Sequence, residues 1–241
     1  MNIRIALAGN PNSGKTTLFN ALTGSTQYVG NWPGVTVEKK EGKLKKHSGV
    51  TIVDLPGIYS LSPYTLEEVI ARDYILGEKP DVIINIIDAS NLERNLYLTT
   101  QLAELGVPMV AALNMMDIVE KRSDRINMTK LAERLGCPAV GISAARGKGI
   151  DELIESALSV KAAPIPQTFD KGVEDALAAM AEVVSTASAL KNYPLRWAAV
   201  KLLERDEALL GKAELSAETQ KKAEALRTAL ETAQEDDTES I

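Results

Sequence analysis

The chain has 241 residues, a net charge of −6 and a pI near 5.1, with 45% hydrophobic and 25% charged residues. These values are typical of a soluble globular protein of one or two domains and argue against a general nucleic-acid binder. The sequence holds no apolar run of 18 or more residues and no signal-peptide pattern at its start, so we expect neither a membrane span nor a leader.

Strand and helix signals alternate from residue 1 to about residue 160. Apolar runs predict strands at 3–8, 37–45, 50–54, 82–88, 108–113 and 138–142. Helical spacing predicts helices at 15–22, 65–77, 92–105, 128–136 and 150–158. Most of the strands look buried on both faces, as parallel strands are, whereas 37–45 alternates and turns into the next strand as an antiparallel edge pair. The expected fold is α/β, with a doubly wound, mostly parallel sheet in residues 1–163.

The composition changes at Ala162-Ala163-Pro164-Ile165-Pro166, where two prolines predict a linker. Beyond it only helical patterns remain, at 171–190, 194–210 and 217–233, and Ser216 is the expected N-cap of the last. We expect a small all-helical domain over 164–241, with a frayed acidic tail at 235–239.

The first loop fits the phosphate-binding pattern G-x-x-x-x-G-K-[ST]. It runs Gly9-Asn10-Pro11-Asn12-Ser13-Gly14-Lys15-Thr16-Thr17, between an expected strand and an expected helix. Backbone N–H groups of such a loop surround the β-phosphate, Lys15 would contact the β- and γ-phosphates, and the Thr16 hydroxyl would bind Mg²⁺. The bare alternative, a glycine turn that caps a helix, fits this context less well.

A second phosphate segment, Asp54-Leu55-Pro56-Gly57, ends the strand at 50–54. Asp54 would hold Mg²⁺ through water, and the Gly57 N–H would bind the γ-phosphate. Thr36, in the polar loop 24–36, is the expected second Mg²⁺ ligand, with Thr23 and Thr26 as competitors. Position 58 is Ile58, which cannot orient the attacking water by a hydrogen bond, so backbone groups, a partner's arginine or a bound cation must assist hydrolysis.

Asn114-Met115-Met116-Asp117 predicts that the base is guanine, because the Asp117 carboxylate can accept from both N1–H and the 2-amino group. Asn114 would brace the phosphate loop, and Met115 would pack on the base where the usual motif has Lys. Ser143-Ala144-Ala145 follows the last strand, and the Ala144 N–H is the expected donor to guanine O6.

Together with Val29-Gly30-Asn31-Trp32-Pro33-Gly34-Val35-Thr36-Val37-Glu38, these motifs closely resemble the N-terminal GTPase domain of bacterial FeoB ferrous iron transporters. The resemblance covers essentially the whole chain and implies GTP/GDP as ligand, Mg²⁺ and K⁺ as cofactors, and contacts from Gly34 and Val35 to the nucleotide. It implies K⁺ binding by the Asn12 side chain and by backbone carbonyls near Gly30 and Trp32. Asn12, Lys15, Thr36 and Gly57 are therefore the expected catalytic set. A competing interpretation has Trp32 simply packing on the nucleotide or the domain.

The same resemblance implies a helical domain that slows nucleotide release, like a dissociation inhibitor, and a C-terminal membrane transport domain as partner. It places the chain on the cytoplasmic side of the bacterial inner membrane, where small Feo-system proteins or further copies of the chain are possible partners and nucleic acid is not. Two alternatives remain open: a soluble RNA- or ribosome-associated, cation-dependent GTPase, and a binding switch with negligible turnover.

The remaining chemistry-bearing residues are few. Cys137, the only cysteine, is expected to be a small buried residue and not a nucleophile, and His47 lies in a polar turn. One Cys, one His and scattered carboxylates do not predict an Fe²⁺ site.

Overall fold

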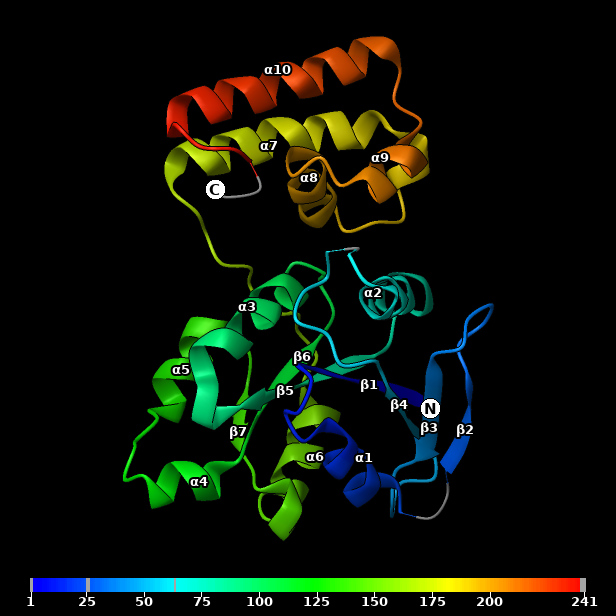
Figure 1. Cartoon of the computed structure of the whole chain (residues 1–241), viewed down its shortest axis with the longest axis vertical. Helices are drawn as coiled ribbons and strands as arrows, with labels where there is room; N and C mark the ends of the chain where they lie inside the picture. Colours follow the sequence, from blue (N-terminus) through cyan, green and yellow to red (C-terminus); the bar gives the residue numbers. More distant parts are fainter. Residues whose placement is uncertain (1, 25–26, 63, 239–241) are drawn as a thin grey trace. The chain divides into compact units, whose positions relative to one another are not determined.

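A computed structural model describes residues 2–24, 27–62 and 64–238. The chain divides into two compact units, Met1–Pro166 and Gln167–Ile241, each of which is described by itself (Figure 1). None of the described helices is long and apolar enough to cross a membrane.

The first unit is built on a seven-stranded sheet, as far as the described residues show, in the order β2-β3-β4-β1-β5-β6-β7. Its strands are β1 (Ile3–Gly9), β2 (Gln27–Asn31), β3 (Glu38–Lys43), β4 (Val50–Asp54), β5 (Val82–Asp88), β6 (Met109–Asn114) and β7 (Ala139–Gly141). β1 pairs in parallel with β4 and β5, and β6 in parallel with β5 and β7, while β3 is antiparallel to both β2 and β4. The predicted α/β class and mostly parallel sheet are confirmed.

Helices cover both faces of this sheet. They are α1 (Lys15–Thr23), α2 (Leu66–Glu78), α3 (Leu92–Ala103), α4 (Met116–Lys121), α5 (Met128–Leu135) and α6 (Ile150–Ser159). Apolar side chains of α1 and α6, among them Phe19 and Leu153, share one core with the strands, and Figure 1 shows α2 and α3 on the opposite face. The predicted motifs at 9–17, 54–57 and 114–117 begin at the carboxyl ends of β1, β4 and β6.

Two local expectations for this unit were wrong. The predicted polar loop at 24–36 contains β2, and the edge of the sheet has two antiparallel pairings where one was expected. The strand is short, and both Tyr28 and Val29 are exposed, so no buried face gives it an alternating pattern. The helix α4 was also not predicted, because it starts inside the Asn114–Asp117 motif, from Met115 at a φ of 65°.

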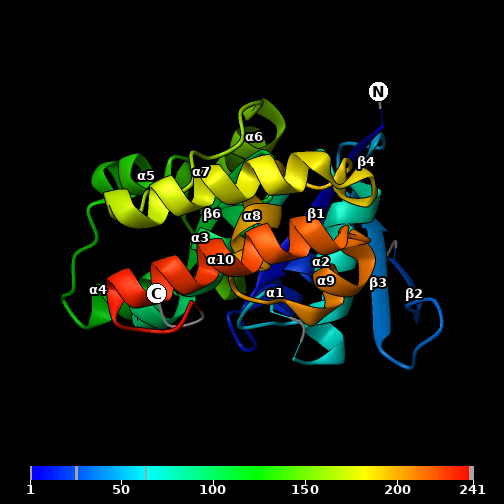
Figure 2. The ribbon, with the colours of Figure 1, turned by 90° about the horizontal axis from the view of Figure 1, so that it is seen from above.

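The second unit is helical in its described part. Its helices are α7 (Lys171–Thr186), α8 (Leu195–Leu203), α9 (Glu207–Ala213) and α10 (Ala217–Gln234). Figures 1 and 2 show α7 and α10 side by side in opposite directions, and Leu177, Met180 and Trp197 are buried in this unit. Ser216 caps α10 by accepting from the Thr219 N–H, as predicted.

The expected single helix at 194–210 is two helices. Arg205 has a φ of 57°, which ends α8, and Asp206 then caps α9 by accepting the Leu209 N–H at 2.9 Å. An N-cap aspartate within an apolar-periodic run was the available signal for this break. The predicted helix at 171–190 likewise ends at Thr186, before a short 3₁₀ turn, η3 (Ser188–Leu190).

Arg205, which follows α8, forms ion pairs with two glutamates of α10. Arg205 Nη1 lies 2.5 Å from Glu231 Oε1, and Arg205 Nη2 lies 3.2 Å from Glu224 Oε1. The hydrogen bond from Arg205 lowers the pKa of Glu231 to about 2, from a usual value of 4.5.

Candidate nucleotide-binding site

One cavity joins the phosphate loop to two segments far along the chain. Its volume is about 580 Å³, and its lining consists of Asn10, Pro11, Asn12, Gly14, Lys15, Thr16, Thr17, Gly57 and Met115. The fold thus brings together residues from the end of β1, the start of α1, the loop after β4 and the end of β6.

Two residues of the loop between β1 and α1 have left-handed backbone conformations. Asn12 has a φ of 66° and Gly14 a φ of 90°. Gly14 caps α1 without a side chain, so the first N–H groups of the helix remain available to an anion. A Cβ at Gly14 would lie 2.2 Å from Asn114 Nδ2, so only glycine fits this position.

Lys15 is paired inside the protein. Its Nζ lies 2.5 Å from Asp54 Oδ1, and both side chains are buried. Burial raises the pKa of Asp54, and the charge and hydrogen bond of Lys15 act in the opposite direction. The residue expected to contact phosphate and the residue expected to hold Mg²⁺ therefore contact one another, an ion pair that the sequence did not predict.

The segment after β4 is tied to β1 by its backbone. The Leu55 N–H donates to Leu7 O at 3.1 Å, and the Ile58 N–H donates to Gly9 O at 3.2 Å. The Ile58 side chain is buried and does not line the cavity, while Pro56 precedes Gly57 at its edge. Beside this segment, the Arg94 guanidinium lies 4.4 Å from the Tyr59 ring centroid.

Asn114 connects the phosphate loop to the last loop of the unit. Its Nδ2 donates to Ser13 O at 2.9 Å, which is the predicted bracing contact. Its Oδ1 accepts the Ala144 N–H at 2.9 Å, so the N–H expected to meet guanine O6 is engaged within the protein. Ala145 is the next residue in η2 (Ala144–Arg146).

The carboxylate of Asp117 lies beside the same loop. Ser143 Oγ donates to its Oδ1 at 2.9 Å, and Arg146 Nε lies 3.1 Å from its Oδ2. The hydrogen bond from Ser143, with the charge of Arg146, lowers the pKa of Asp117. Arg146 was not predicted from the sequence, although it directly follows the Ser143–Ala145 motif. The Met116 side chain lies close to Gly141, the last residue of β7. A Cβ added at Gly141 would come within 3.3 Å of Met116 Cγ.

The segment predicted to hold K⁺ and the second Mg²⁺ ligand lies elsewhere in this structure. Gly30 pairs with Lys39 in the β2–β3 hairpin, and the Trp32 carbonyl accepts the Val35 N–H at 3.2 Å. Thr36 is exposed, and among the described residues it does not line the phosphate cavity. The structure brings Asn12 to the cavity but leaves Gly30, Trp32, Gly34, Val35 and Thr36 out of its lining.

Thr23 and Thr26 were the alternative candidates for the second Mg²⁺ ligand. Thr23 lies in α1, where its buried hydroxyl donates to Phe19 O at 2.8 Å, so it is unsuited to bind a metal at the phosphates. Thr26 lies outside the described residues. Trp32 packs edge to face on Tyr74, with ring centroids 5.3 Å apart.

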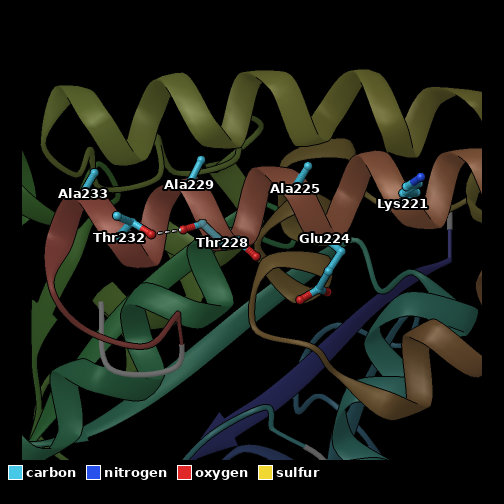
Figure 3. Close-up of a pocket in the computed structure, with 7 residues that line it drawn as sticks. All are labelled: Lys221, Glu224, Ala225, Thr228, Ala229, Thr232 and Ala233. Atoms are coloured by element: carbon cyan, nitrogen blue, oxygen red, sulfur yellow. Dashed lines mark hydrogen bonds between the residues drawn. The ribbon is translucent and has the colours of Figure 1, made fainter.

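The other chemistry-bearing residues lie apart from this cavity. Cys137 is buried, and burial raises the pKa of its thiol to about 11. In the described part of the chain no three His, Cys, Asp or Glu residues gather as a metal site. Seven exposed residues of α10 line a groove of about 660 Å³, in which the Thr232 hydroxyl bonds to Thr228 O at 2.7 Å (Figure 3). Apart from Lys221 and Glu224, its lining consists of alanine and threonine side chains.

Comparison with known proteins agrees with this geometry. Residues 3–157 match the family described as ferrous iron transport protein B, and residues 169–241 match the FeoB cytosolic helical domain. The Fe(2+) transporter FeoB of Escherichia coli (strain K12) is 58% identical over 156 residues, which are 63% of this chain and 20% of that protein. The alignment therefore spans about a fifth of the curated relative.

Solved structures of NFeoB from S. thermophilus match over both units. A variant bound to mGDP has a TM-score of 0.94 at 43% identity, covering 100% of this chain and 94% of that one. The mGMPPNP-bound protein has a TM-score of 0.88 at 45% identity, covering 99% and 91%. A further variant, bound to GDP.AlF4-, has a TM-score of 0.89 at 44% identity, covering 99% and 94%.

Proposed function

Because the chain belongs to the FeoB ferrous iron transport family, as its N-terminal G domain followed by the cytosolic helical domain, we propose that it binds guanine nucleotides and hydrolyses GTP in the phosphate-loop cavity. The observation that carries this proposal is the pair of contacts made by Asn114, which tie Ser13 of the phosphate loop to Ala144 beside Asp117. The nucleotides bound by the S. thermophilus relatives support the same assignment.

In this proposal the guanine lies between Met115 and the loop at Ser143–Ala145. Its N1–H and 2-amino group donate hydrogen bonds to the Asp117 carboxylate. The phosphates lie against the N–H groups of residues 9–17 and against Lys15. Ser143 and Arg146 already hold both oxygens of Asp117, and a carboxylate has lone pairs left for two more donors. A base that lacks the two guanine donors would leave those lone pairs buried and unpaired.

The Mg²⁺ proposal fits the donor set but requires a rearrangement. Thr16 faces the cavity, and hydroxyl and carboxylate oxygens suit Mg²⁺. Asp54 would have to exchange Lys15 for a metal-bound water, and Thr36 would have to approach from its exposed position. When bound, Mg²⁺ would neutralise charge on the phosphate oxygens.

The K⁺ proposal likewise rests on residues that lie apart in this structure. Asn12 lines the cavity, whereas the Trp32 carbonyl accepts the Val35 N–H. Release of the turn at residues 32–37 would free that carbonyl. Since Ile58 is buried and apolar, a cation at Asn12 would supply the positive charge that hydrolysis otherwise lacks.

We further propose that nucleotide state controls Fe²⁺ uptake by a membrane domain of the same protein, with residues 164–241 slowing nucleotide release. The chain would then act at the cytoplasmic face of the inner membrane, alone or with small Feo-system proteins or further copies. These statements rest on the family, and the alignment spans about a fifth of the length of the Escherichia coli FeoB protein.

The test is single-turnover GTP hydrolysis in K⁺ and in Na⁺. We expect faster hydrolysis in K⁺ for the wild-type chain and no difference between the salts for Asn12→Ala. Asn192→Ala, an exposed substitution in the helical unit, is the matched control. Absence of hydrolysis in both salts would favour a binding switch, and equal nonzero rates in the wild type would exclude the K⁺ role.

A further inference from the structure

A second cavity lies outside the nucleotide site, between α2 and the turn that follows β2. Its volume is about 430 Å³, which is the size of a small-molecule site. One wall consists of apolar side chains from the turn and the helix: Trp32, Pro33, Val35, Leu66, Val69 and Ile70.

The charged residues that line this cavity are all paired. Arg4 Nη1 lies 2.7 Å from Glu78 Oε2, and Lys39 Nζ lies 3.3 Å from Glu41 Oε2. The remaining one, Asp73, accepts from Arg72 Nε at 3.3 Å. Because no lining charge lacks a partner, an ionic ligand would have to break an existing pair, and a neutral ligand is favoured.

The cavity does contain unmatched hydrogen-bonding capacity. Trp32 is 6% exposed, and its buried Nε1–H has no acceptor among the described residues. Tyr74 is also 6% exposed, and its hydroxyl meets no partner with full hydrogen-bond geometry among the described residues, although Arg4 is close enough to act on it. A buried donor without an acceptor is unfavourable, and a ligand oxygen would satisfy it. Burial raises the pKa of Tyr74 to about 12 despite the nearby Arg4, so this hydroxyl stays a neutral donor.

We propose that this cavity binds a neutral, amphipathic small molecule. Its oxygen would accept the indole Nε1–H of Trp32, and its apolar body would contact Val69 and Ile70. No residue of the nucleotide cavity lines it, so the two sites are distinct.

Occupancy of this cavity has a consequence for the nucleotide site. The backbone N–H of Trp32 donates to Val37 O at 2.9 Å, and the backbone carbonyl of Trp32 accepts from the Val35 N–H at 3.2 Å, which closes the turn that contains Thr36. A ligand that packs under Trp32 stabilises this closed turn and opposes the movement of Thr36 towards the phosphates. This second step rests on the proposed GTPase function, whereas the binding step does not.

Cyclohexanone is a suitable probe, because it is neutral, has an acceptor oxygen on an apolar ring and causes no aromatic ring-current shifts. Binding is followed by the two tryptophan indole N–H signals in ¹⁵N–¹H spectra, assigned with Trp32→Phe. We expect a saturable shift of the Trp32 signal, with a Kd on the order of 1 mM for so small a ligand. The Trp197 signal, from the helical unit, serves as the internal reference.

Two glycines provide a matched pair of variants. Gly77 lies in α2 and lines the cavity, Gly211 lies in α9, and a Cβ at either meets no atom within 4 Å. Gly77→Leu is expected to weaken cyclohexanone binding at least tenfold, and Gly211→Leu to leave it unchanged. Trp32→Phe, followed by the Ile70 backbone amide, is expected to weaken binding about fivefold through the lost hydrogen bond.

The binding proposal is overturned if the Trp32 signal does not shift, if both indole signals move equally, or if Gly77→Leu binds as the wild type does. In the functional arm, saturating cyclohexanone is expected to slow GTP hydrolysis in the wild type and in Gly211→Leu, but not in Gly77→Leu. Binding without slowed hydrolysis overturns only the coupling, and absence of hydrolysis without ligand counts against the proposed function alone.

Discussion

The Nζ of Lys15 lies 2.5 Å from Oδ1 of Asp54, so the phosphate-loop lysine is already neutralised by a buried carboxylate. In the proposed site, a nucleotide phosphate would have to displace Asp54 from Lys15 before it could use that charge. Mg²⁺ would assist by drawing Asp54 towards its own hydration shell. The ion pair therefore links phosphate affinity to the presence of the metal.

Asp54→Asn tests this link. In EDTA we expect GDP to bind about tenfold more tightly to the variant, because Lys15 is released and a negative charge near the phosphates is removed. The gain in affinity on adding Mg²⁺ should shrink at the same time. Isothermal titration calorimetry with and without Mg²⁺ measures both effects, and weaker GDP binding in EDTA would contradict the prediction. Loss of the ion pair is also expected to lower unfolding stability by about 3 kcal/mol.

Asp117→Asn tests the base assignment. The amide cannot accept from both guanine donors, so GTP affinity should fall about a hundredfold, and xanthosine triphosphate should bind in its place. Competition against a fluorescent guanine nucleotide measures both. Asp124→Asn, at an exposed position, removes the same charge and is expected to change neither affinity. Unchanged GTP binding by Asp117→Asn would exclude this carboxylate as the reader of the base.

Gly14→Ala tests the geometry of the phosphate loop. The new Cβ would lie 2.2 Å from Asn114 Nδ2, at a φ of 90°. We expect loss of nucleotide binding and a stability loss of about 1–3 kcal/mol. Gly77→Ala, within the helix α2 and free of contacts, should instead stabilise the chain by about 0.5–1 kcal/mol. Denaturant unfolding of the two variants compares them, and equal effects would show that the loop tolerates a side chain.

The Arg205 network predicts how the helical unit responds to acid. Glu231 has a pKa of about 2 in the folded chain and a usual value of 4.5, so its contribution is fully present above pH 4.5 and is lost as the pH falls towards 2. We expect Glu231→Gln to be less stable than the wild type near pH 7 and to lose less stability between pH 4.5 and 2.

Trp197 fluorescence during denaturant unfolding, in a Trp32→Phe background, measures this effect in the intact chain. Glu218→Gln, at an exposed position on the same helix, is the control and should follow the wild type. Parallel pH profiles for Glu231→Gln and the wild type would show that the Arg205 pair does not contribute.

Much of the fold was predictable because buried strands and capped helices have local signatures. The strands β1, β5 and β6 are mostly apolar, and Ser216 marks the start of α10. β2 was missed because Tyr28 and Val29 are exposed and the strand is held by pairing with β3, a contact distant from its own sequence pattern. The break at Arg205 was missed because apolar spacing continues across it.

The order and spacing of the motifs indicated which segments meet at one cavity, but not the contacts between their side chains. Nothing in the local sequence pairs Lys15 with Asp54, or Arg146 with Asp117, because these contacts arise only when strands distant in sequence end at the same edge of the sheet. The packing of Trp32 on Tyr74 is likewise a tertiary contact that the local sequence does not reveal.

Cys137, buried and with a raised thiol pKa, has a practical consequence for labelling experiments on this chain. A thiol of this kind reacts slowly with maleimides and spin labels near neutral pH. The wild-type chain is therefore a nearly silent background for site-directed labelling. One cysteine introduced on the surface of each unit would give doubly labelled samples, from which distances in different nucleotide states are obtained without first removing a native residue.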